Sequence, residues 1–167
     1  MDMTTADLCD SHEALFESGS LRVLTPMFQQ YGGAKRFCGP AVTVKVFEEN
    51  GLIRDVLNTE GGRRVLVVDG GGSLRCALVG GNLGEIAVAR GWAGVLVFGG
   101  VRDREEMSQC DVGIAAIGMN PRRCARGSGG QRDVTVALPG ATVRPAEWIY
   151  ADLDGVLVSG SELKWKG

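Results

Sequence analysis

Two short apolar runs with a helical segment between them constrain the fold more than any other feature of this sequence. Residues 65–68 read Val-Leu-Val-Val, residues 95–98 read Val-Leu-Val-Phe, and glycines follow both runs. Short apolar runs bounded by glycine are typical of buried strands. A strand–helix–strand crossover requires its two strands to be parallel. The segment from Arg64 to Glu106 therefore predicts an α/β fold with a parallel sheet.

Local signals mark the start and the end of the intervening helix, which we expect over residues 82–90. Asn82 is the expected N-cap, and Glu85 follows three residues later, which completes a capping-box pattern. Gly91 is suited to close the helix. The strand that follows is expected to break at Gly99-Gly100.

The two predicted strands bring several anion-binding groups to one edge of the sheet. Parallel strands place their carboxyl ends together, where α/β proteins bind ligands. Glycine turns let a ligand approach the backbone, and the free amides at the helix start bind anions. Arg102 can pair with a carboxylate, and Asp103 is a candidate ligand for a hard metal ion. The sequence predicts a small-anion site here, although a surface ion pair with Arg104 or Glu105 is the alternative for these two residues.

The rest of the chain predicts short elements without repeats or an interdomain linker. We expect one domain of residues 1–167, with helices mainly in the first half and strands in the second. In one loop, Arg122, Arg123 and Arg126 could line the mouth of the site or an intersubunit contact, but we expect them to be solvated. The expected elements are a helix from Thr4 or Thr5 to about Glu17, a strand at 41–47, a helix from Asn50 ending at Gly61-Gly62, an ambiguous segment at 74–79, a strand at 114–117, a loop at 121–133, a hairpin of 134–138 with 141–143, and strands at 147–150 and 155–158.

Composition argues against two classes of partner. The net charge is −2 and the isoelectric point is near 5.5, which is unsuited to a nucleic-acid surface. No apolar run approaches the roughly 18 residues of a membrane span. The first residues lack the basic start and apolar block of a secretion signal. We therefore expect a cytoplasmic protein with no nucleic-acid partner and no membrane partner.

The cysteines predict reduced thiols. An odd number of cysteines without Cys-x-x-Cys spacing is typical of a cytosolic protein and argues against structural zinc. The five cysteines are Cys9, Cys38, Cys76, Cys110 and Cys124.

Other catalytic chemistries find little support in the residues. Histidine-based catalysis or zinc binding would depend on His12, the only histidine, which we expect to be exposed on the first helix. A Schiff base needs a desolvated lysine, and only Lys45 could be buried, although a strand lysine usually points outward. In the stretch 70–75, an arginine stands where a dinucleotide-binding loop needs its third glycine. The lysines are Lys35, Lys45, Lys164 and Lys166.

The residues around Arg102 resemble the signature of a known family. Gly81, twenty further residues, Arg102-Asp103, two residues and Glu106 have the spacing of the metal-dependent 4-hydroxy-4-methyl-2-oxoglutarate aldolases. These enzymes share the RraA-like family with the regulator of ribonuclease activity A. The resemblance covers nearly the whole chain. Its other matching segments are residues 5–10, 39–44, 50–52, 68–73 and 150–155.

The resemblance implies a fold, an assembly and a set of site residues. The fold is a layered β/β/α swivelling-type domain, and the assembly is a homotrimer or a dimer of trimers with sites near subunit boundaries. Arg102 and Asp103 are the implied catalytic residues: Arg102 binds a 2-oxo acid and stabilises the developing enolate, and Asp103 coordinates Mg²⁺ or Mn²⁺. Glu106 contributes directly or orients the site from behind. The backbone amides that would hold the substrate carboxylate and ketone belong to Gly80, Gly81, Asn82 and Leu83.

The resemblance also implies an activity. The expected reaction is class II aldol cleavage of 4-hydroxy-4-methyl-2-oxoglutarate to two pyruvates, with oxaloacetate decarboxylation alongside, because both reactions pass through the pyruvate enolate. The alternative is a non-catalytic regulator that binds and inhibits a ribonuclease. The regulators depart from the motif at the aspartate, whereas Asp103 is present here, so we favour the enzyme. A quinone methyltransferase is not supported, because no glycine loop of the S-adenosylmethionine type follows a first strand.

Overall fold

The parallel sheet predicted from the two apolar runs forms the centre of the molecule. In the computed structural model, which describes residues 1–164, the two runs are strands β4 (Val65–Asp69) and β6 (Gly94–Val101), and they pair directly in parallel. On the outer sides, β3 (Phe37–Lys45) pairs with β4 and β7 (Gly113–Met119) pairs with β6, both also in parallel. The predicted crossover is therefore confirmed.

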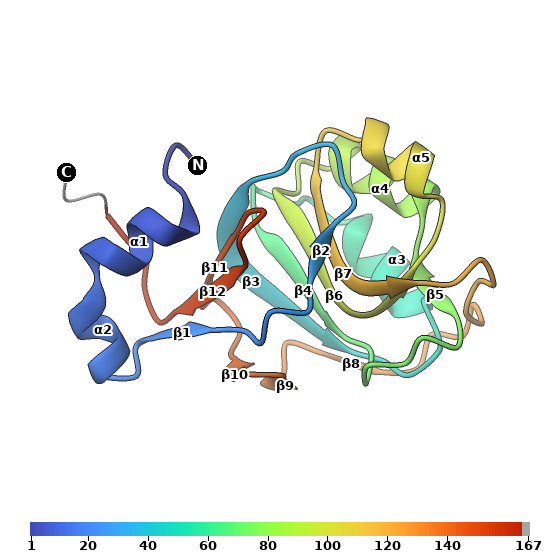
Figure 1. Cartoon of the computed structure of the whole chain (residues 1–167). Helices are drawn as coiled ribbons and strands as arrows, with labels where there is room; N and C mark the ends of the chain where they lie inside the picture. Colours follow the sequence, from blue (N-terminus) through green and yellow to red (C-terminus); the bar gives the residue numbers. More distant parts are fainter. Residues whose placement is uncertain (165–167) are drawn as a thin grey trace.

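Antiparallel strands extend this sheet on both sides (Figure 1). The strand β3 is long enough to pair with β4 through residues 41–45 and with β11 through residues 37–40. The remaining strands are β1 (Leu21–Val23), β2 (Gln29–Gln30), β5 (Ala77–Val79), β8 (Gln131–Arg132), β9 (Val136–Leu138), β10 (Ala141–Val143), β11 (Trp148–Ala151) and β12 (Val156–Ser159). The helices are α1 (Thr5–Ser11), α2 (Glu13–Glu17), α3 (Gly51–Leu57), α4 (Gly81–Ala89) and α5 (Arg104–Gln109). The hairpin predicted around residues 139–140 is confirmed as β9–β10, and the strands expected at 147–150 and 155–158 pair with each other as β11 and β12.

The central sheet separates two apolar layers. Because side chains alternate along a strand, Leu66 and Val68 of β4 pack with α3, α4 and α5, whereas Val65 and Val67 pack on the opposite face with β9, β10 and β11. Helices α3, α4 and α5 thus cover one face and β-structure covers the other, which is the expected β/β/α layering, while α1 and α2 pack beside β1, β11 and β12 (Figure 1). Helices α1 to α3 lie in the first half of the chain and β6 to β12 in the second, as expected, and β1 to β5 also lie in the first half.

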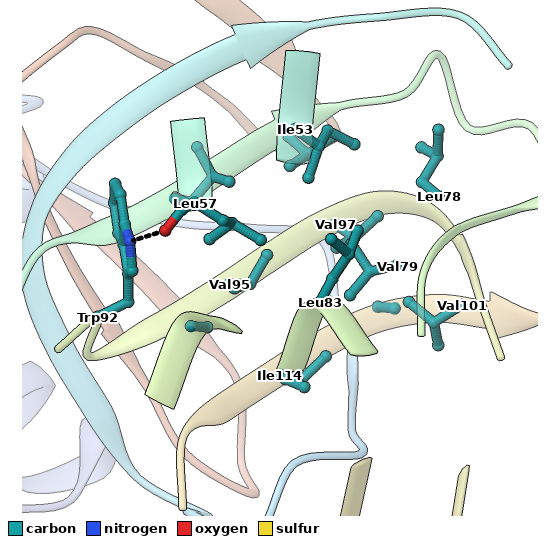
Figure 2. Close-up of a cluster of buried hydrophobic side chains, with 14 of the residues drawn as sticks. Ile53, Leu57, Leu78, Val79, Leu83, Trp92, Val95, Val97, Val101 and Ile114 are labelled. Carbon is teal, nitrogen blue, oxygen red and sulfur yellow. Dashed lines mark hydrogen bonds between the residues drawn. The ribbon is translucent and has the colours of Figure 1, made fainter. Parts of the chain in front are cut away.

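The core on the helical face fixes the start of α4 (Figure 2). Leu83 in the first turn of α4 is buried in the same cluster as Val79 of β5 and Val97 of β6. At the other end of this core, the Trp92 indole donates a hydrogen bond to the Leu57 carbonyl at 3.1 Å. The amino terminus of α4 is therefore packed against the carboxyl ends of β5 and β6, which positions its free amides beside Arg102.

The first predicted helix is interrupted at His12, and this histidine is buried rather than exposed. Thr4 caps α1 and forms a capping box with Asp7, as a helix starting near Thr4 or Thr5 requires. The backbone turns at His12, which ends α1 and precedes α2. The ring nitrogen Nδ1 lies 3.0 Å from the Leu8 carbonyl oxygen. The expectation of an exposed His12 was wrong because the turn folds its side chain back onto α1.

Several predicted boundaries differ from the structure, including that of the strand expected at 41–47, which is β3 (Phe37–Lys45). The predicted capping box is wrong: α4 begins at Gly81 with Gly80 as N-cap, Asn82 lies inside the first turn, and no side chain of the helix caps it. Strand β6 continues through Gly99-Gly100 because Gly100 pairs with both β5 and β7 across a register shift. Helix α3 ends at Leu57, before Gly61-Gly62.

The cysteine prediction is also wrong in part. Cys76 and Cys124 form a disulfide, with their Cα atoms 4.9 Å apart. They are 48 residues apart in the sequence, so only the pairing of β5 with the loop before β8 brings them together. Cys9, Cys38 and Cys110 are free thiols. None of the helices within residues 1–164 is long and apolar enough to cross a bilayer.

Candidate active site

A small pocket lies where β5, α4 and the end of β6 meet. Its volume is about 80 Å³, well below the roughly 300–1,000 Å³ of sites for drug-sized ligands, so it suits a ligand smaller than those. The pocket contains most of the expected site residues. Those in its lining are Gly80, Asn82, Leu83, Arg102 and Asp103.

Asp103 adopts a backbone conformation that points its carboxylate away from its own helix. Its φ of 63° and ψ of 50° are left-handed, a conformation that Asp and Asn tolerate better than most residues. Asp103 stands at the N-cap of α5 but makes no side-chain cap there. Instead its Oδ2 accepts a hydrogen bond from the Gly81 amide at 3.2 Å. An N-cap aspartate aimed at a different helix, in a strained conformation, is typical of a functional position.

Gly80 and Gly81 are required by the space that two carboxylates occupy. A Cβ on Gly80 would lie 2.6 Å from Asp103 Oδ2, and a Cβ on Gly81 would lie 2.7 Å from Glu106 Cβ and against its carboxylate. Any larger residue would displace these groups. Glu106 is therefore packed directly against Gly81, as Asp103 is against Gly80, although Glu106 is not in the pocket lining.

Arg102 is held beside Asp103 at the mouth of the pocket. Its Nε lies 3.7 Å from Asp103 Oδ2, and its Nη1 donates to the Pro121 carbonyl at 3.4 Å. Both side chains are about one-third exposed. The ion pair that forms joins Arg102 to Asp103, and neither residue pairs with Arg104 or Glu105. The Arg104 guanidinium instead lies over the Tyr31 ring. Arg102 keeps guanidinium N–H groups available for a carboxylate.

The start of α4 offers backbone amides to the same pocket. The first amides of a helix have no intrahelical partner and carry partial positive charge. The Gly81 amide already donates to Asp103, so the amides of Asn82 and Leu83 are the ones left for a ligand.

Four further pocket residues were missed or misjudged from the sequence. Arg123 and Arg126 are exposed, as expected of a solvated loop, and they also line the pocket, which was the alternative for them. Arg54 of α3 lines it as well. Asn50 lines it and donates its side-chain amide to the Leu78 carbonyl at 3.4 Å. Among the described residues of the lining, four are arginines and only Asp103 is acidic, so the pocket attracts anions.

The carboxylates suit a hard cation that keeps several water ligands better than a metal ion whose ligands all come from the protein. Within residues 1–164, no group of three or more His, Cys, Asp or Glu side chains could hold a metal ion together. Asp103 lies in the pocket and Glu106 directly behind it, with Gly80 and Gly81 leaving the room that a Cβ would fill. Mg²⁺ is commonly bound by one or two carboxylates plus water and substrate oxygens. The residues present therefore fit Mg²⁺ or Mn²⁺ and do not fit structural zinc.

The rival nucleophiles are not positioned for catalysis. Lys45 is exposed and belongs to a different hollow, and Lys35 donates to the Gly32 carbonyl at 2.7 Å. Lys166 lies outside the described residues. Cys110 is buried between α4 and α5, and burial raises the pKa of its thiol, which keeps it in the weakly nucleophilic protonated form.

Comparison with known proteins identifies the relatives of this chain. The pattern of the RraA-like family, described as Aldolase/RraA, matches residues 5–158. The chain belongs to the RraA-like family. A family member from Paraburkholderia phymatum is 58% identical over 163 residues, which cover 98% of this chain and 99% of that protein. It carries the provisional name 4-hydroxy-4-methyl-2-oxoglutarate aldolase.

Solved structures support the same membership and carry different functional names. The RNA-processing inhibitor RraA from Thermus thermophilis is 40% identical with a TM-score of 0.91, and the match covers 99% of this chain and 98% of that one. A Geobacillus kaustophilus HTA426 protein described as S-adenosylmethionine: 2-dimethylmenaquinone methyltransferase is 43% identical with a TM-score of 0.90, covering 96% and 97%. Fold similarity alone does not decide between these names, so the function has to be argued from the chemistry of the site.

Proposed function

We propose that this protein is a divalent-metal-dependent aldolase that cleaves 4-hydroxy-4-methyl-2-oxoglutarate into two pyruvates and also decarboxylates oxaloacetate. One observation carries the proposal: the Asp103 carboxylate is turned toward the Gly80–Gly81 turn, beside Arg102 and the first amides of α4. The names of relatives that are 53–58% identical support the same reaction.

The 2-oxo acid end of the substrate would bind at the amino terminus of α4. The Arg102 guanidinium pairs with the carboxylate, and the amides of Asn82 and Leu83 donate to its oxygens. Asp103, with Glu106 behind it, would hold a divalent cation, which would supply Lewis-acid chemistry at the 2-oxo group. Because Arg102 and the amides are fixed before the substrate arrives, they stabilise the negative charge that develops as the enolate forms.

The bond changes are the same for both substrates up to the enolate. In 4-hydroxy-4-methyl-2-oxoglutarate the C3–C4 bond breaks, its electron pair passes into the pyruvate enolate, and the tertiary hydroxyl loses its proton as C4 becomes the ketone of the second pyruvate. In oxaloacetate the bond to the C4 carboxylate breaks, and carbon dioxide leaves. Protonation of the enolate carbon completes both reactions.

The other arginines support a substrate with a second carboxylate. Arg54, Arg123 and Arg126 line the pocket together with Arg102, which is more positive charge than one carboxylate needs. Both proposed substrates are dicarboxylates. We assign the three arginines to the end of the substrate that lies away from the 2-oxo group.

Replacing Arg126 by alanine is expected to lower kcat/KM for 4-hydroxy-4-methyl-2-oxoglutarate by roughly 10- to 100-fold, the effect of losing one charge-assisted hydrogen bond. Product inhibition by pyruvate should change little, because pyruvate occupies only the 2-oxo acid end. Steady-state kinetics measures both quantities. Arg144→Ala, which removes a 64% exposed arginine outside the pocket, is the matched control. Equal losses for substrate and pyruvate would contradict the assignment of Arg126.

The proposed reaction is tested by measuring pyruvate release from both substrates with Mg²⁺ or Mn²⁺ and after chelation. We expect turnover with metal, loss of turnover with chelator, and recovery when metal is added back, because Arg102 and the amides do not replace the Lewis acid that the cation would supply. Turnover that survives chelation would contradict the metal-dependent mechanism. Absence of pyruvate with every divalent metal would overturn the aldolase proposal.

The similarity to the Thermus RNA-processing inhibitor favours a second candidate, a regulator that binds a ribonuclease. Such a regulator needs its outer surface and not the Asp103 carboxylate. Inhibition of a ribonuclease that is unaffected by chelation and by Asp103→Asn, in a protein without pyruvate-forming activity, would favour this candidate. The family resemblance supports a homotrimer or a dimer of trimers for either function.

A further inference from the structure

The Cys76–Cys124 disulfide joins two walls of the candidate active site. Cys76 precedes β5, whose residues 77–79 line the pocket, and Cys124 follows Arg123, which also lines it. Both cysteines are buried, with 7% and 2% of their surface exposed. The bond therefore links the strand that leads to Gly80 with the arginine-bearing loop.

Besides the disulfide, hydrogen bonds rather than apolar packing hold this loop, which we call the arginine loop (residues 121–130). Its described backbone contacts include the Ala77 amide donating to the Arg122 carbonyl at 2.7 Å and the Gly51 amide donating to the Gly127 carbonyl at 2.9 Å. Glu49 accepts from the Gly129 amide at 3.0 Å. Apart from Cys124, no residue of the arginine loop is fully buried. Because its side chains contribute little apolar burial, the loop is attached to the core by these hydrogen bonds and by the disulfide, which is the covalent link among them.

A surface hollow gives a small thiol access to the disulfide. The hollow, about 390 Å³ in volume, is lined by both cysteines together with Arg75, Arg122 and Arg123. Glu48 is its acidic residue, and Arg75 forms an ion pair with it at 2.5 Å. The remaining positive charge of the hollow attracts an anionic thiol.

We propose that the Cys76–Cys124 disulfide is a redox-exchange site for a small anionic thiol, and that its reduction releases the arginine loop and weakens binding of the second carboxylate of the substrate. The second half of this proposal rests on the proposed aldolase function. The first half depends only on the disulfide, the hollow and the loop.

In the proposed thiol–disulfide exchange, the small thiol is the reductant. A thiolate attacks one sulfur, the Cys76–Cys124 bond breaks, and the other cysteine leaves as a thiolate that takes a proton from water. A second thiol molecule attacks the mixed disulfide and frees the first cysteine. In sum, the protein gains two electrons and two protons, and two thiol molecules become one disulfide.

The test uses the full chain in its oxidised form, treated with reduced glutathione, which is anionic, or with cysteamine, which is cationic. Alkylation and mass spectrometry count the thiols, and rates are normalised to those of each thiol with a small linear disulfide. We expect two additional alkylated cysteines, Cys76 and Cys124, and a higher normalised rate with glutathione. Complete alkylation of both cysteines before any reductant, or a faster normalised rate with cysteamine, would overturn the exchange site.

Release of the loop is measured without reference to activity. Trypsin cleaves after arginine, and the open loop presents Arg122, Arg123 and Arg126. Reduction should raise the rate of cleavage at these three positions roughly tenfold, because proteolysis follows the population of the open form. The double variant Cys76→Ser/Cys124→Ser should be cleaved at the rate of the reduced protein, whether or not a thiol is added. Cys38→Ser, which removes a free thiol elsewhere, should respond to reduction like the wild type. Equal cleavage rates in both redox states would refute release of the loop.

Steady-state kinetics then measures how reduction of the disulfide changes substrate binding at the site. Reduction should raise KM for 4-hydroxy-4-methyl-2-oxoglutarate several-fold, leave inhibition by pyruvate nearly unchanged, and be reversed by reoxidation. An unchanged KM after verified reduction would overturn control of the site. If no pyruvate forms in either redox state, the proposed function has failed, and the thiol count and the tryptic cleavage still decide whether the disulfide is an exchange site that holds the loop.

Discussion

Replacing Asp103 by asparagine is expected to lower the rate of pyruvate formation from 4-hydroxy-4-methyl-2-oxoglutarate by roughly 10²- to 10³-fold at saturating Mg²⁺. An amide oxygen is a much weaker ligand than a carboxylate, and the lost Lewis-acid stabilisation is worth several kcal/mol, at about 1.36 kcal/mol per factor of ten. The fold should persist, because asparagine also tolerates the left-handed backbone at φ 63° and can still accept from the Gly81 amide. Initial rates across a metal titration, with a thermal melt, measure both effects.

The matched control for this change is Asp133→Asn. Asp133 is also left-handed, at φ 57°, and exposed, but it pairs with Arg132 away from the pocket. Its replacement should leave both activity and melting temperature nearly unchanged. Full metal-dependent activity in Asp103→Asn would show that the cation is held elsewhere, and a large loss of melting temperature would assign the aspartate a structural role.

The parts of the fold that were predictable depend on local patterns. The runs 65–68 and 95–98 are parallel strands because each is apolar on both faces, and only a sheet covered on both sides buries such a run. Pro139-Gly140 identified the β9–β10 hairpin because these two residues form a turn between two short apolar runs. Arg102 and Asp103 could be placed at one edge of the sheet because they follow directly after β6.

The parts that were not predictable depend on residues far apart in the sequence. The capping-box pattern at Asn82 and Glu85 did not mark the helix start, because the Gly81 amide is satisfied by Asp103, 22 residues away. The disulfide and the arginine loop depend on the pairing of β5 with residues beyond β7. No local pattern distinguishes an arginine that lines a pocket from one that is solvated, so Arg126 was assigned to solvent.

Replacing Gly80 by alanine is expected to reduce pyruvate formation by roughly 10²-fold, the cost of displacing a catalytic group by about 1 Å. The added Cβ would lie 2.6 Å from Asp103 Oδ2 and 3.2 Å from Arg102 Cγ, so the partly exposed Asp103 carboxylate must rotate away. Melting temperature should change little, because only the ends of side chains move. The backbone of Gly80 has a φ of −144°, which any residue adopts, so the effect tests space and not conformational freedom.

Comparison with Gly81→Ala distinguishes a loss of activity at the site from a loss of stability of the fold. Its Cβ would lie 2.7 Å from Glu106 Cβ, which cannot rotate away, so α4 and α5 must move apart. We expect the free energy of unfolding to fall by about 1–3 kcal/mol, as in other overpacked sites, together with a loss of activity. Gly155→Ala, whose Cβ meets nothing within 4 Å, is the control for both variants. If Gly80→Ala retained full activity, the reaction would not need Asp103 in its position against the turn. The close approach of strand, helix and carboxylate at this edge would then serve the stability of the fold and not catalysis.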